Sequence, residues 1–186
     1  MAIRVELCAP AERDREPFLA AMRASAASHA PWNAPPVTDE AFDALLRRAR
    51  DERFDCSLLR RTGDGAIIGY FNVSEIVRGN FQSAFLGYAA VAEHAGQGYM
   101  SEGLVLVLAR VFGPLQLHRL EANIQPGNAR SLALVRRGGF VNEGYSERYL
   151  KIAGRWRDHE RWAITRERWR ELRPRGRSAA AQSPRR

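Results

Sequence analysis

The pattern of hydrophobic and polar positions predicts a strand and two helices in the first third of the chain. Apolar residues alternate with charged ones over residues 3–7, a period of two that indicates a half-buried strand. An alanine-rich stretch from residue 11 to about residue 29 predicts a long helix, and the proline-rich segment 31–36 ends it in a rigid loop. Thr38 is the predicted N-cap of a second helix, which runs to about Arg53.

Three strands are predicted in the middle of the chain. Residues 54–60 form the first, the turn 62–65 reverses the chain, and residues 66–73 return antiparallel to it. Residues 74–84 are predicted to form a loop or a bulged hairpin. The apolar run over residues 85–91 then predicts a buried central strand.

Helices and strands alternate in the rest of the chain. A helix is predicted over 104–112, a core strand over 120–124, and a further helix to about residue 137 with Asn128 as its N-cap. Two final strands form a hairpin that turns at Ala153-Gly154 and ends near residue 165. Residues 166–172 are predicted to add a helical turn. The resulting order, βααβββαβαββ, indicates the α+β class.

The length of 186 residues fits one domain with a full core and is too short for two. We expect a domain over residues 1–172 and a disordered tail over 173–186, because the tail is rich in Arg, Ala, Ser and Pro. The first residues lack the apolar core of a signal peptide, and no apolar run approaches the ~18 residues that a membrane span needs. These features predict a cytoplasmic protein without a membrane partner.

Charge is distributed unevenly along the chain. The formal net charge is +8, and residues 166–186 contain eight Arg and two Glu, a net of +6 that leaves only +2 for the first 165 residues. This distribution does not predict a folded nucleic-acid-binding face. The tail either gives weak, nonspecific contact with ribosomal RNA or is simply solvated. Cys8 and Cys56 lack the spacing of metal ligands or redox motifs, so no metal is predicted.

A glycine-bearing loop connects the predicted central strand to the helix that follows it. Gly96 and Gly98 flank Gln97 in this loop. A strand, a short loop and a helix in succession present free backbone N–H groups at a helix N-terminus, and such groups favour a bound phosphate. The glycines also let the backbone approach the anion closely. The spacing matches neither the dinucleotide fingerprint nor the nucleoside triphosphatase motif, so a tight strand-to-helix turn is the alternative interpretation.

The same loop resembles that of a known family. Residues Gly96-Gln97-Gly98-Tyr99-Met100-Ser101-Glu102 are similar to the acetyl-CoA loop of the GNAT acetyltransferase superfamily. The chain departs from the family pattern at Ala95, where Gln or Arg is usual, and at Met100, where Gly or Ala is usual. The Tyr-Met pair is common in the RimJ/RimL branch, the N-terminal acetyltransferases of ribosomal proteins. Further segments that resemble this branch are 76–81, 86–88, 118–119, 143–145, 149–150 and 154–159.

The resemblance implies the GNAT fold, a mixed and mostly antiparallel sheet whose splayed central strands are flanked by helices. It also implies acetyl-CoA as co-substrate, with the pyrophosphate on the loop amides and the pantetheine arm between the splayed strands like an added strand. A backbone N–H of Val91 or Ala90 would stabilise the tetrahedral oxyanion. The implied cofactor-binding residues are Ala90, Val91, Ala92, Ala95, Gly96, Gln97, Gly98, Tyr99, Met100, Ser101, Asn128 and Ser131.

Asn128 and Ser131 supply the side chains of this implied site. Their spacing places both on one side of the first turn of a helix. The resemblance implies that Asn128 hydrogen-bonds the pantetheine and that Ser131 faces its sulfur. Many GNAT members place a tyrosine acid four residues further on, where this chain has Val135, so Ser131 is the catalytic candidate as a hydrogen-bond donor to the thiolate. The alternative is a simple N-cap at Asn128 and a helix-surface residue at Ser131.

Three carboxylates are candidates for the general base, namely Glu75, Glu121 and Glu147. Glu121 is preferred because it lies on the strand that borders the predicted splay, although pairing with an arginine would explain it equally well. On the acceptor side, the resemblance implies contacts from Trp32, Glu75, Arg78 and Tyr88. Trp32 either walls the acceptor groove or fills a gap between two helices, and Arg78 either shapes the acceptor side or lies on a solvated strand.

The resemblance implies an acetyl-CoA-dependent N-acetyltransferase that acts on the N-terminal α-amino group of a ribosomal protein. Because an α-amino group loses its proton more easily than a lysine side chain, a modest base would suffice. One alternative is a GNAT enzyme that acts on a lysine side chain or on a small-molecule amine. Another is a non-catalytic module that binds the ribosome or RNA. The sequence leaves monomer and homodimer open.

Overall fold

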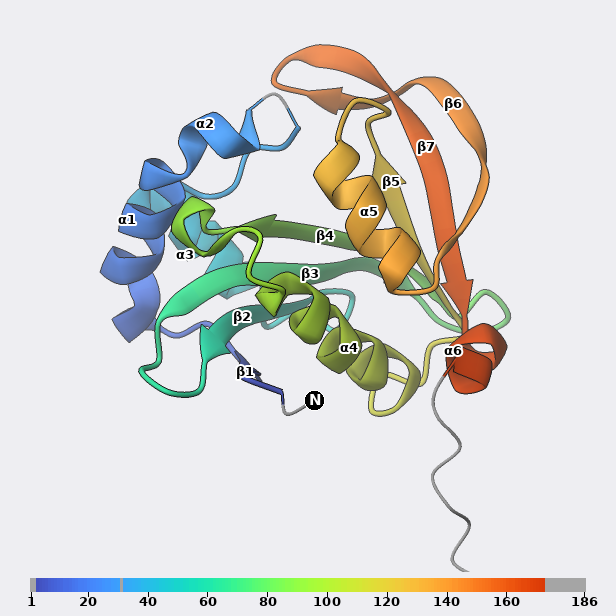
Figure 1. Cartoon of the computed structure of the whole chain (residues 1–186), viewed down its shortest axis with the longest axis horizontal. Helices are drawn as coiled ribbons and strands as arrows, with labels where there is room; N and C mark the ends of the chain where they lie inside the picture. The colour runs from blue at the N-terminus through green and yellow to red at the C-terminus, as the bar shows by residue number, and fades with distance from the viewer. Residues whose placement is uncertain (1–2, 31, 173–186) are drawn as a thin grey trace, which may run out of the picture.

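One seven-stranded sheet organises the chain. The structure, a computed structural model, describes residues 3–30 and 32–172. The strands lie in the order β1-β2-β3-β4-β5-β7-β6, and within the described residues only β4 and β5 pair in parallel (Figure 1). Their bounds are β1 Val5–Cys8, β2 Asp55–Arg61, β3 Ile67–Val77, β4 Ser83–Ala90, β5 Arg119–Ile124, β6 Val141–Ile152 and β7 Arg155–Thr165. The predicted α+β class and the mostly antiparallel sheet are confirmed.

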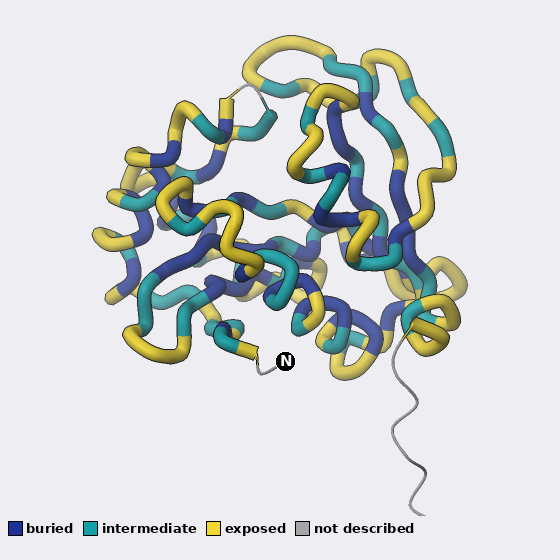
Figure 2. Tube along the Cα trace, viewed as in Figure 1, coloured by how far each residue is buried: buried dark blue, intermediate teal, exposed yellow. Residues whose placement is uncertain are grey.

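Helices cover both faces of the sheet, and each face has its own buried core (Figures 1 and 2). On one face α1 and α3 pack through Phe18 and Phe42, whose ring centroids are 5.4 Å apart. On the other face α4 and α5 bury residues such as Leu104 and Val135. The helices are α1 Arg15–Ala24, α2 Ala26–His29, α3 Asp39–Arg48, α4 Tyr99–Phe112, α5 Ala129–Arg137 and α6 Arg166–Leu172, with 3₁₀ turns η1 Glu12–Asp14 and η2 Ala92–His94.

Two element boundaries differ from the prediction, and one open alternative is decided. The helix expected over residues 11–29 is interrupted at Ser25, because its hydroxyl donates to the Ala21 carbonyl and accepts from the Ala92 N–H. Helix α4 begins at Tyr99 instead of Leu104. The segment 74–84, expected as a loop or bulged hairpin, is the bulged hairpin, since β3 continues to Val77 with an irregular register after Ser74 and β4 returns antiparallel from Ser83.

Other local predictions are confirmed. The Thr38 hydroxyl accepts the Ala41 N–H at 3.3 Å and so caps α3, although this helix ends at Arg48 rather than near residue 53. The last two strands form a hairpin that turns at Ala153-Gly154, both with positive φ. Helix α6 is present. The predicted tail over residues 173–186 lies outside the described residues, so the boundary at residue 172 stays a prediction.

The feature that shapes the site is the separation of β4 from β5. The two strands pair only at Ser83–Arg119, Ala84–Leu120 and Phe85–Glu121. Beyond these pairs β4 continues beside β3 as far as Ala90, whereas β5 continues beside β7 as far as Ile124. The strands therefore diverge, and the splay that the resemblance implied is present.

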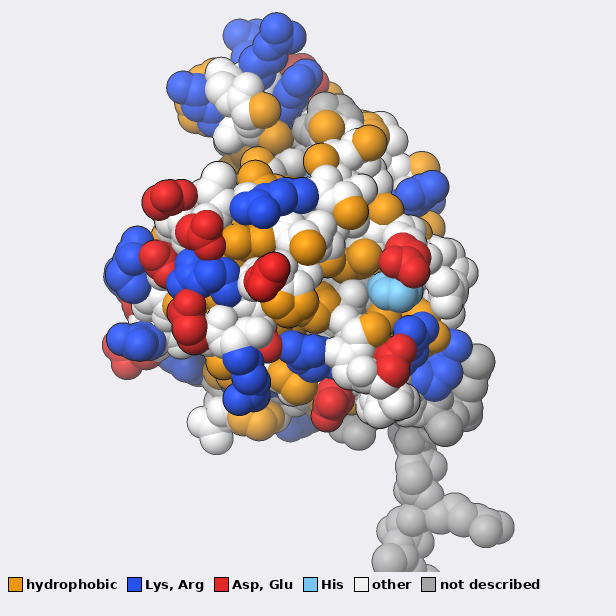
Figure 3. All heavy atoms as spheres, turned by 90° about the vertical axis from the view of Figure 1, so that its left-hand side faces the viewer, with side chains coloured by type: hydrophobic (Ala, Val, Ile, Leu, Met, Phe, Trp, Pro, Cys, Tyr) orange, Lys and Arg blue, Asp and Glu red, His pale blue; other side chains and the backbone are white. Residues whose placement is uncertain are grey.

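Charged side chains are mixed on the face formed by α1 and α3. Figure 3 shows arginines among aspartates and glutamates on this side of the molecule. Arg15 is an example, since its guanidinium pairs with Glu12, Asp39 and Asp43. This face therefore lacks the single-signed basic surface that nucleic acid would require. No helix in the described ranges has the length and apolarity needed to cross a membrane.

We predict that Gly103→Ala destabilises the fold. A Cβ at Gly103 would lie 2.8 Å from Leu59 Cδ1 and 2.8 Å from Phe71 Cε2, both in the core beneath α4. Overpacking costs about 1–3 kcal/mol, which outweighs the gain of roughly 1 kcal/mol that alanine brings to a helix. Circular dichroism should show a Tm lower by about 2–4 °C per kcal/mol lost.

Gly63→Ala is the control for this prediction, because a Cβ at Gly63 would have no neighbour within 4 Å. Its Tm should equal that of the wild type. An unchanged or higher Tm for Gly103→Ala would show that the contact of α4 with the sheet is looser than the geometry indicates.

Candidate active site

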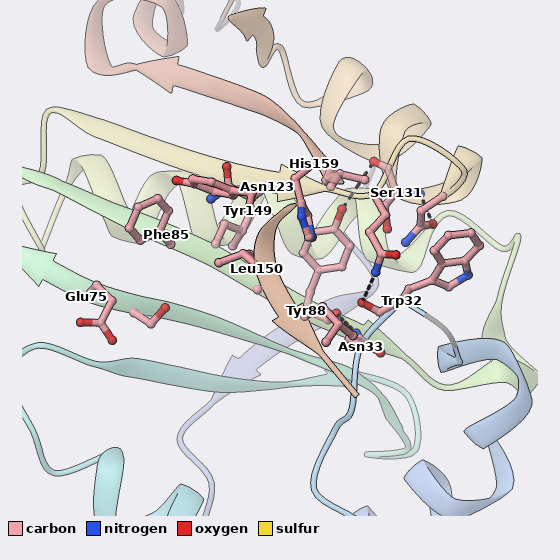
Figure 4. A pocket seen from close by; sticks show the side chains of 17 residues that line it. Trp32, Asn33, Glu75, Phe85, Tyr88, Asn123, Ser131, Tyr149, Leu150 and His159 are labelled. Carbon is pink, nitrogen blue, oxygen red and sulfur yellow. Dashed lines mark hydrogen bonds between the residues drawn. The ribbon is translucent and has the colours of Figure 1, made fainter. Parts of the chain in front are cut away.

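A cavity of about 550 Å³ occupies the splay between β4 and β5 (Figure 4). Adjacent residues of a strand face opposite sides of the sheet. Leu86 faces the core under α4, so its neighbour Phe85 faces the other side, and Asn123 likewise points away from that core. The cavity nevertheless includes Phe85 and Asn123 together with Ser131 of α5. It therefore passes through the sheet and joins its two faces.

The cavity is poor in positive charge although the chain is rich in arginine. Glu75 contributes a carboxylate to the lining, and no Arg or Lys side chain is among the described residues that line it. The remaining lining residues are Trp32, Asn33, Ser74, Phe85, Leu86, Gly87, Tyr88, Asn123, Ile124, Gln125, Asn128, Ser131, Tyr149, Leu150, Ile152 and His159. Such a lining suits a ligand that brings its own positive charge or donor groups.

The glycine loop ends in the N-terminus of α4, as the sequence indicated. Gly96 and Gly98 have φ values of 78° and 87°, and Gly98 is the N-cap of the helix. Within the described residues, no backbone N–H from Gly96 to Met100 donates a hydrogen bond, since the first donors are Ser101 and Glu102, both to the Gly98 carbonyl. Unpaired amides at a helix N-terminus fit a phosphate group.

Arg4 of the segment before β1 anchors this loop. Its guanidinium donates to the Gln97 carbonyl and to the Glu102 carboxylate, each at 2.9 Å, and stacks 4.4 Å from the Tyr99 ring centroid. The hydrogen bond from Arg4 lowers the pKa of Glu102. The sequence reasoning missed Arg4, because its place in an alternating strand pattern indicated only a solvent-facing residue.

The hydrogen bonds at the end of β4 show which of the backbone groups predicted to hold the cofactor are free. The Val91 N–H donates to the Ile68 carbonyl at 2.8 Å, and the Ala92 N–H donates to the Ser25 hydroxyl at 2.9 Å. Both groups are therefore already bonded. Neighbouring residues of a strand point their N–H and C=O groups to opposite sides. The Val91 N–H points toward β3, so the N–H and C=O groups of Ala90 point toward the splay.

Two side chains bond the carbonyls that face the splay. The His29 Nε2–H donates to the Ala90 carbonyl at 2.8 Å, and the Asn33 amide donates to the Tyr88 carbonyl at 3.0 Å. No local pattern in the sequence predicted either contact, since 61 and 55 residues separate the partners. The segment between α2 and α3 thereby attaches to the open side of β4.

Asn128 and Ser131 lie together at the start of α5, and both line the cavity. The Asn128 side-chain oxygen Oδ1 accepts the Ser131 N–H at 3.2 Å, which confirms the N-cap. The capping bond uses the oxygen and leaves the Asn128 amide N–H groups for a ligand. The Tyr88 hydroxyl donates to the Ser131 carbonyl at 3.4 Å, and burial raises the pKa of Tyr88 to about 12. Tyr88 therefore stays protonated at neutral pH.

Trp32 closes one end of the cavity. Its carbonyl accepts from the Gln125 side chain at 3.1 Å, and its ring contacts the loop between β5 and α5, where a Cβ at Gly127 would lie 3.1 Å from Trp32 Cη2. Trp32 thus both lines the cavity and fills the space beside that loop, so the two interpretations of the sequence are compatible.

Of the predicted catalytic and substrate-binding residues, Glu121 and Arg78 are not brought to the cavity, and the predicted cofactor-binding positions 90–92 and 95–101 lie outside its lining. Glu121 lies where β4 and β5 still pair, and its carboxylate accepts from Arg119 at 2.8 Å. The pairing with an arginine, which was the alternative interpretation, is present, so we do not propose Glu121 as the base. Arg78 points away from the cavity and donates to the Leu115 carbonyl. Neither residue is part of the lining, and neither is Glu147.

Unpaired amides that suit a pyrophosphate lie at the N-terminus of α4, and the splay beside β4 holds a cavity that includes residues from both faces of the sheet. A protein with this arrangement is of the class of acyltransferases that use coenzyme A. Comparison with known families agrees. Residues 4–141 match the acetyltransferase (GNAT) domain family, and the chain belongs to it.

Individual relatives support the RimJ/RimL likeness. The chain is 36% identical over 118 residues to the probable N-acetyltransferase YjcK of Bacillus subtilis, covering 63% of this chain and 65% of that protein. It is 42% identical over 103 residues to the ribosomal protein uS5-alanine N-acetyltransferase of Escherichia coli, covering 55% of this chain and 53% of that protein. The matches thus span less than two thirds of either relative.

Solved structures extend the likeness to nearly the whole chain. Mycobacterium smegmatis RimJ in complex with CoA-disulfide superposes with a TM-score of 0.80 at 29% identity, covering 90% of this chain and 83% of that one. The S5-alanine acetyltransferase from Vibrio fischeri has a TM-score of 0.79 at 23% identity, covers 91% of this chain and 97% of that one, and shows the fold alone. The chain is therefore a member of the GNAT acetyltransferase family that is similar to RimJ in sequence and fold.

We predict that Arg4→Gln weakens the binding of acetyl-CoA several-fold, measured as Kd by calorimetric titration. The loop would lose the guanidinium that joins Gln97 to Glu102, so its amides would be less well positioned for a phosphate. Arg110→Gln is the control, because Arg110 pairs with Asp55 at the other end of α4. Equal Kd values for Arg4→Gln and the wild type would show that the loop holds its shape without Arg4.

Proposed function

We propose that this chain transfers the acetyl group of acetyl-CoA to an amine, and that the amine is the N-terminal α-amino group of a ribosomal protein. The observation that carries the proposal is the cavity through the splay, which joins the loop side of the sheet to a far side with a carboxylate and no lining cation. The similarity to the uS5-alanine N-acetyltransferase of Escherichia coli supports the choice of acceptor.

The proposal assigns the co-substrate to the backbone more than to side chains. The free amides between Gly96 and Met100 hold the pyrophosphate, assisted by the helix dipole of α4. The open edge of β4 pairs with the amides of the pantetheine arm, and the Ala90 N–H, rather than that of Val91, stabilises the oxyanion. The Asn128 amide bonds the arm.

Ser131 is proposed to face the sulfur and to donate a hydrogen bond to the departing thiolate. A hydroxyl is a weaker acid than a thiol with pKa of about 8.5, so this donation stabilises the thiolate without protonating it. Trp32, Glu75 and Tyr88 are proposed to bound the acceptor, since all three line the cavity. Arg78 keeps no role in this proposal, because its guanidinium is bonded elsewhere.

The chemistry favours an α-amino acceptor over a lysine side chain. An α-amino group with a pKa of about 7.7–8.0 is roughly 10–15% neutral at pH 7, whereas a lysine amine with a pKa near 10.4 is neutral well below 0.1% of the time. The difference is about 3.5 kcal/mol in deprotonation free energy. The described residues that line the cavity offer one carboxylate beside neutral polar groups, a set better matched to the smaller cost of deprotonating an α-amino group.

We predict that the wild type binds acetyl-CoA with micromolar affinity and that Gly98→Trp abolishes this binding. The Gly98 φ of 87° disfavours any side chain, and an indole would cover the amides at the start of α4. Gly79→Trp is the matched control, since Gly79 has a φ of 67° in an exposed turn between β3 and β4. Calorimetric titration checks all three proteins. A folded wild type that does not bind acetyl-CoA would remove the proposed function.

We predict that deleting the gene exposes a free N-terminus on one ribosomal protein, measured by mass spectrometry of total protein. The purified enzyme should acetylate the corresponding peptide at its α-amino group and leave a control peptide with a blocked N-terminus and a lysine unmodified. Transfer to the lysine peptide or to a polyamine, with an unchanged proteome, would point to a different acceptor. Absence of any transfer, with RNA binding that requires residues 173–186, would favour a non-catalytic module.

A further inference from the structure

His159 of β7 is the buried titratable side chain of the cavity. It is 2% exposed, and it lines the cavity together with Glu75, Tyr88 and Ser131. Its ring centroid lies 6.2 Å from that of Tyr149, which β6 brings across by a register shift between Ser146 and Leu150. Figure 4 shows the imidazole projecting into the cavity from β7.

The hydrogen bond of His159 determines its tautomer. Nδ1 lies 2.9 Å from the Arg157 carbonyl oxygen, and a carbonyl cannot donate, so Nδ1 carries the hydrogen. In the neutral ring the lone pair is then on Nε2. Within the described residues Nε2 has no hydrogen-bond partner, although the ring is buried at the cavity wall. The protein therefore presents a nitrogen base to whatever occupies the cavity.

The surroundings keep this base neutral until it is used. Burial lowers the pKa of His159, and the Arg157 carbonyl and the neighbouring Asp158 carboxylate offset part of that effect. The Tyr149 phenol faces the ring from β6, the Tyr88 phenol lines the cavity from β4, and Glu75 supplies its carboxylate from β3. No lining Arg or Lys among the described residues competes for the Nε2 lone pair.

We propose that His159 is the general base that accepts a proton from the acceptor ammonium through Nε2. This inference rests on the proposed acetyl transfer and supplies the residue that Glu121 does not. Glu75 is less suited, because it is exposed in the β3 bulge and lies at the end of the cavity away from Ser131 (Figure 4).

The proton balance of the step is complete. Nε2 takes one proton from R–NH₃⁺ and so frees the lone pair of the amine. That lone pair forms the N–C bond to the thioester carbonyl, and the C–S bond then breaks with its electrons on sulfur. The second proton of the nitrogen goes to the thiolate, and the imidazolium returns the first proton to solvent. The products are the amide, the free thiol and one proton.

The test uses His159→Asn, because an asparagine amide can still donate to the Arg157 carbonyl but offers no basic nitrogen. At pH 7 only roughly 10–15% of an α-amine is neutral, so loss of the base should lower kcat for the acceptor peptide about tenfold. The defect should shrink toward unity near pH 9.5, because the amine then arrives neutral. Kd for acetyl-CoA should not change. His118→Asn, at the exposed pair with Glu167, should match the wild type at every pH.

Each other outcome has a distinct meaning. A wild-type rate for His159→Asn at pH 7, or an equal defect at all pH values, would overturn the role of His159 while leaving acetyl transfer in place. A wild type that binds acetyl-CoA but acetylates no amine would overturn both proposals. Should His159→Asn fail to fold, ¹⁵N NMR of labelled histidine in the wild type decides instead. It should show a hydrogen on Nδ1 and a bare Nε2 at pH 7, and the opposite tautomer would overturn the role.

Discussion

The separation of β4 from β5 is the constraint on which the rest of the structure depends. Each strand has a stronger partner on its other side, since β4 pairs with β3 along most of its length and β5 pairs with β7 throughout. After three shared residue pairs the two strands therefore diverge. A divergence in mid-sheet leaves backbone N–H and C=O groups without a strand partner, and such groups need other hydrogen bonds. His29 and Asn33 bond two of the carbonyls, and the N–H of Ala90 faces the gap.

The second requirement is a rigid end to helix α4. Backbone amides bind a phosphate only when their directions are fixed, and a loop with two glycines has no intrinsic rigidity. Arg4 supplies the rigidity from outside the loop by joining a loop carbonyl to the Glu102 carboxylate. Arg4, which lies just before the edge strand β1, thus fixes a loop about a hundred positions later in the chain.

Sequence periodicity sufficed for elements whose signals are local. Thr38 and Asn128 cap their helices as predicted, and the hairpin turns at Ala153-Gly154. The failures have non-local causes. Ser25 breaks a helix because its hydroxyl meets the Ala92 N–H, 67 residues away. Glu121 pairs with Arg119, and a periodic pattern does not predict such a pairing between two side chains of one strand. The segment 154–159 resembled the RimJ/RimL branch, but alternation along β7 does not show that His159 faces a cavity.

The loop and the cavity differ in how strongly each depends on the identity of its side chains. On the loop side the unpaired groups are main-chain amides, which nearly any residue can provide as long as the two glycines keep their conformations. The side chains that line the cavity, such as Trp32, Glu75 and Tyr149, can be altered directly by single substitutions. Acceptor preference can therefore drift without disturbing the co-substrate, and one scaffold can give rise to paralogues that modify different amines. We therefore expect the side chains that line the cavity to vary more among such proteins than the backbone conformation of the loop does.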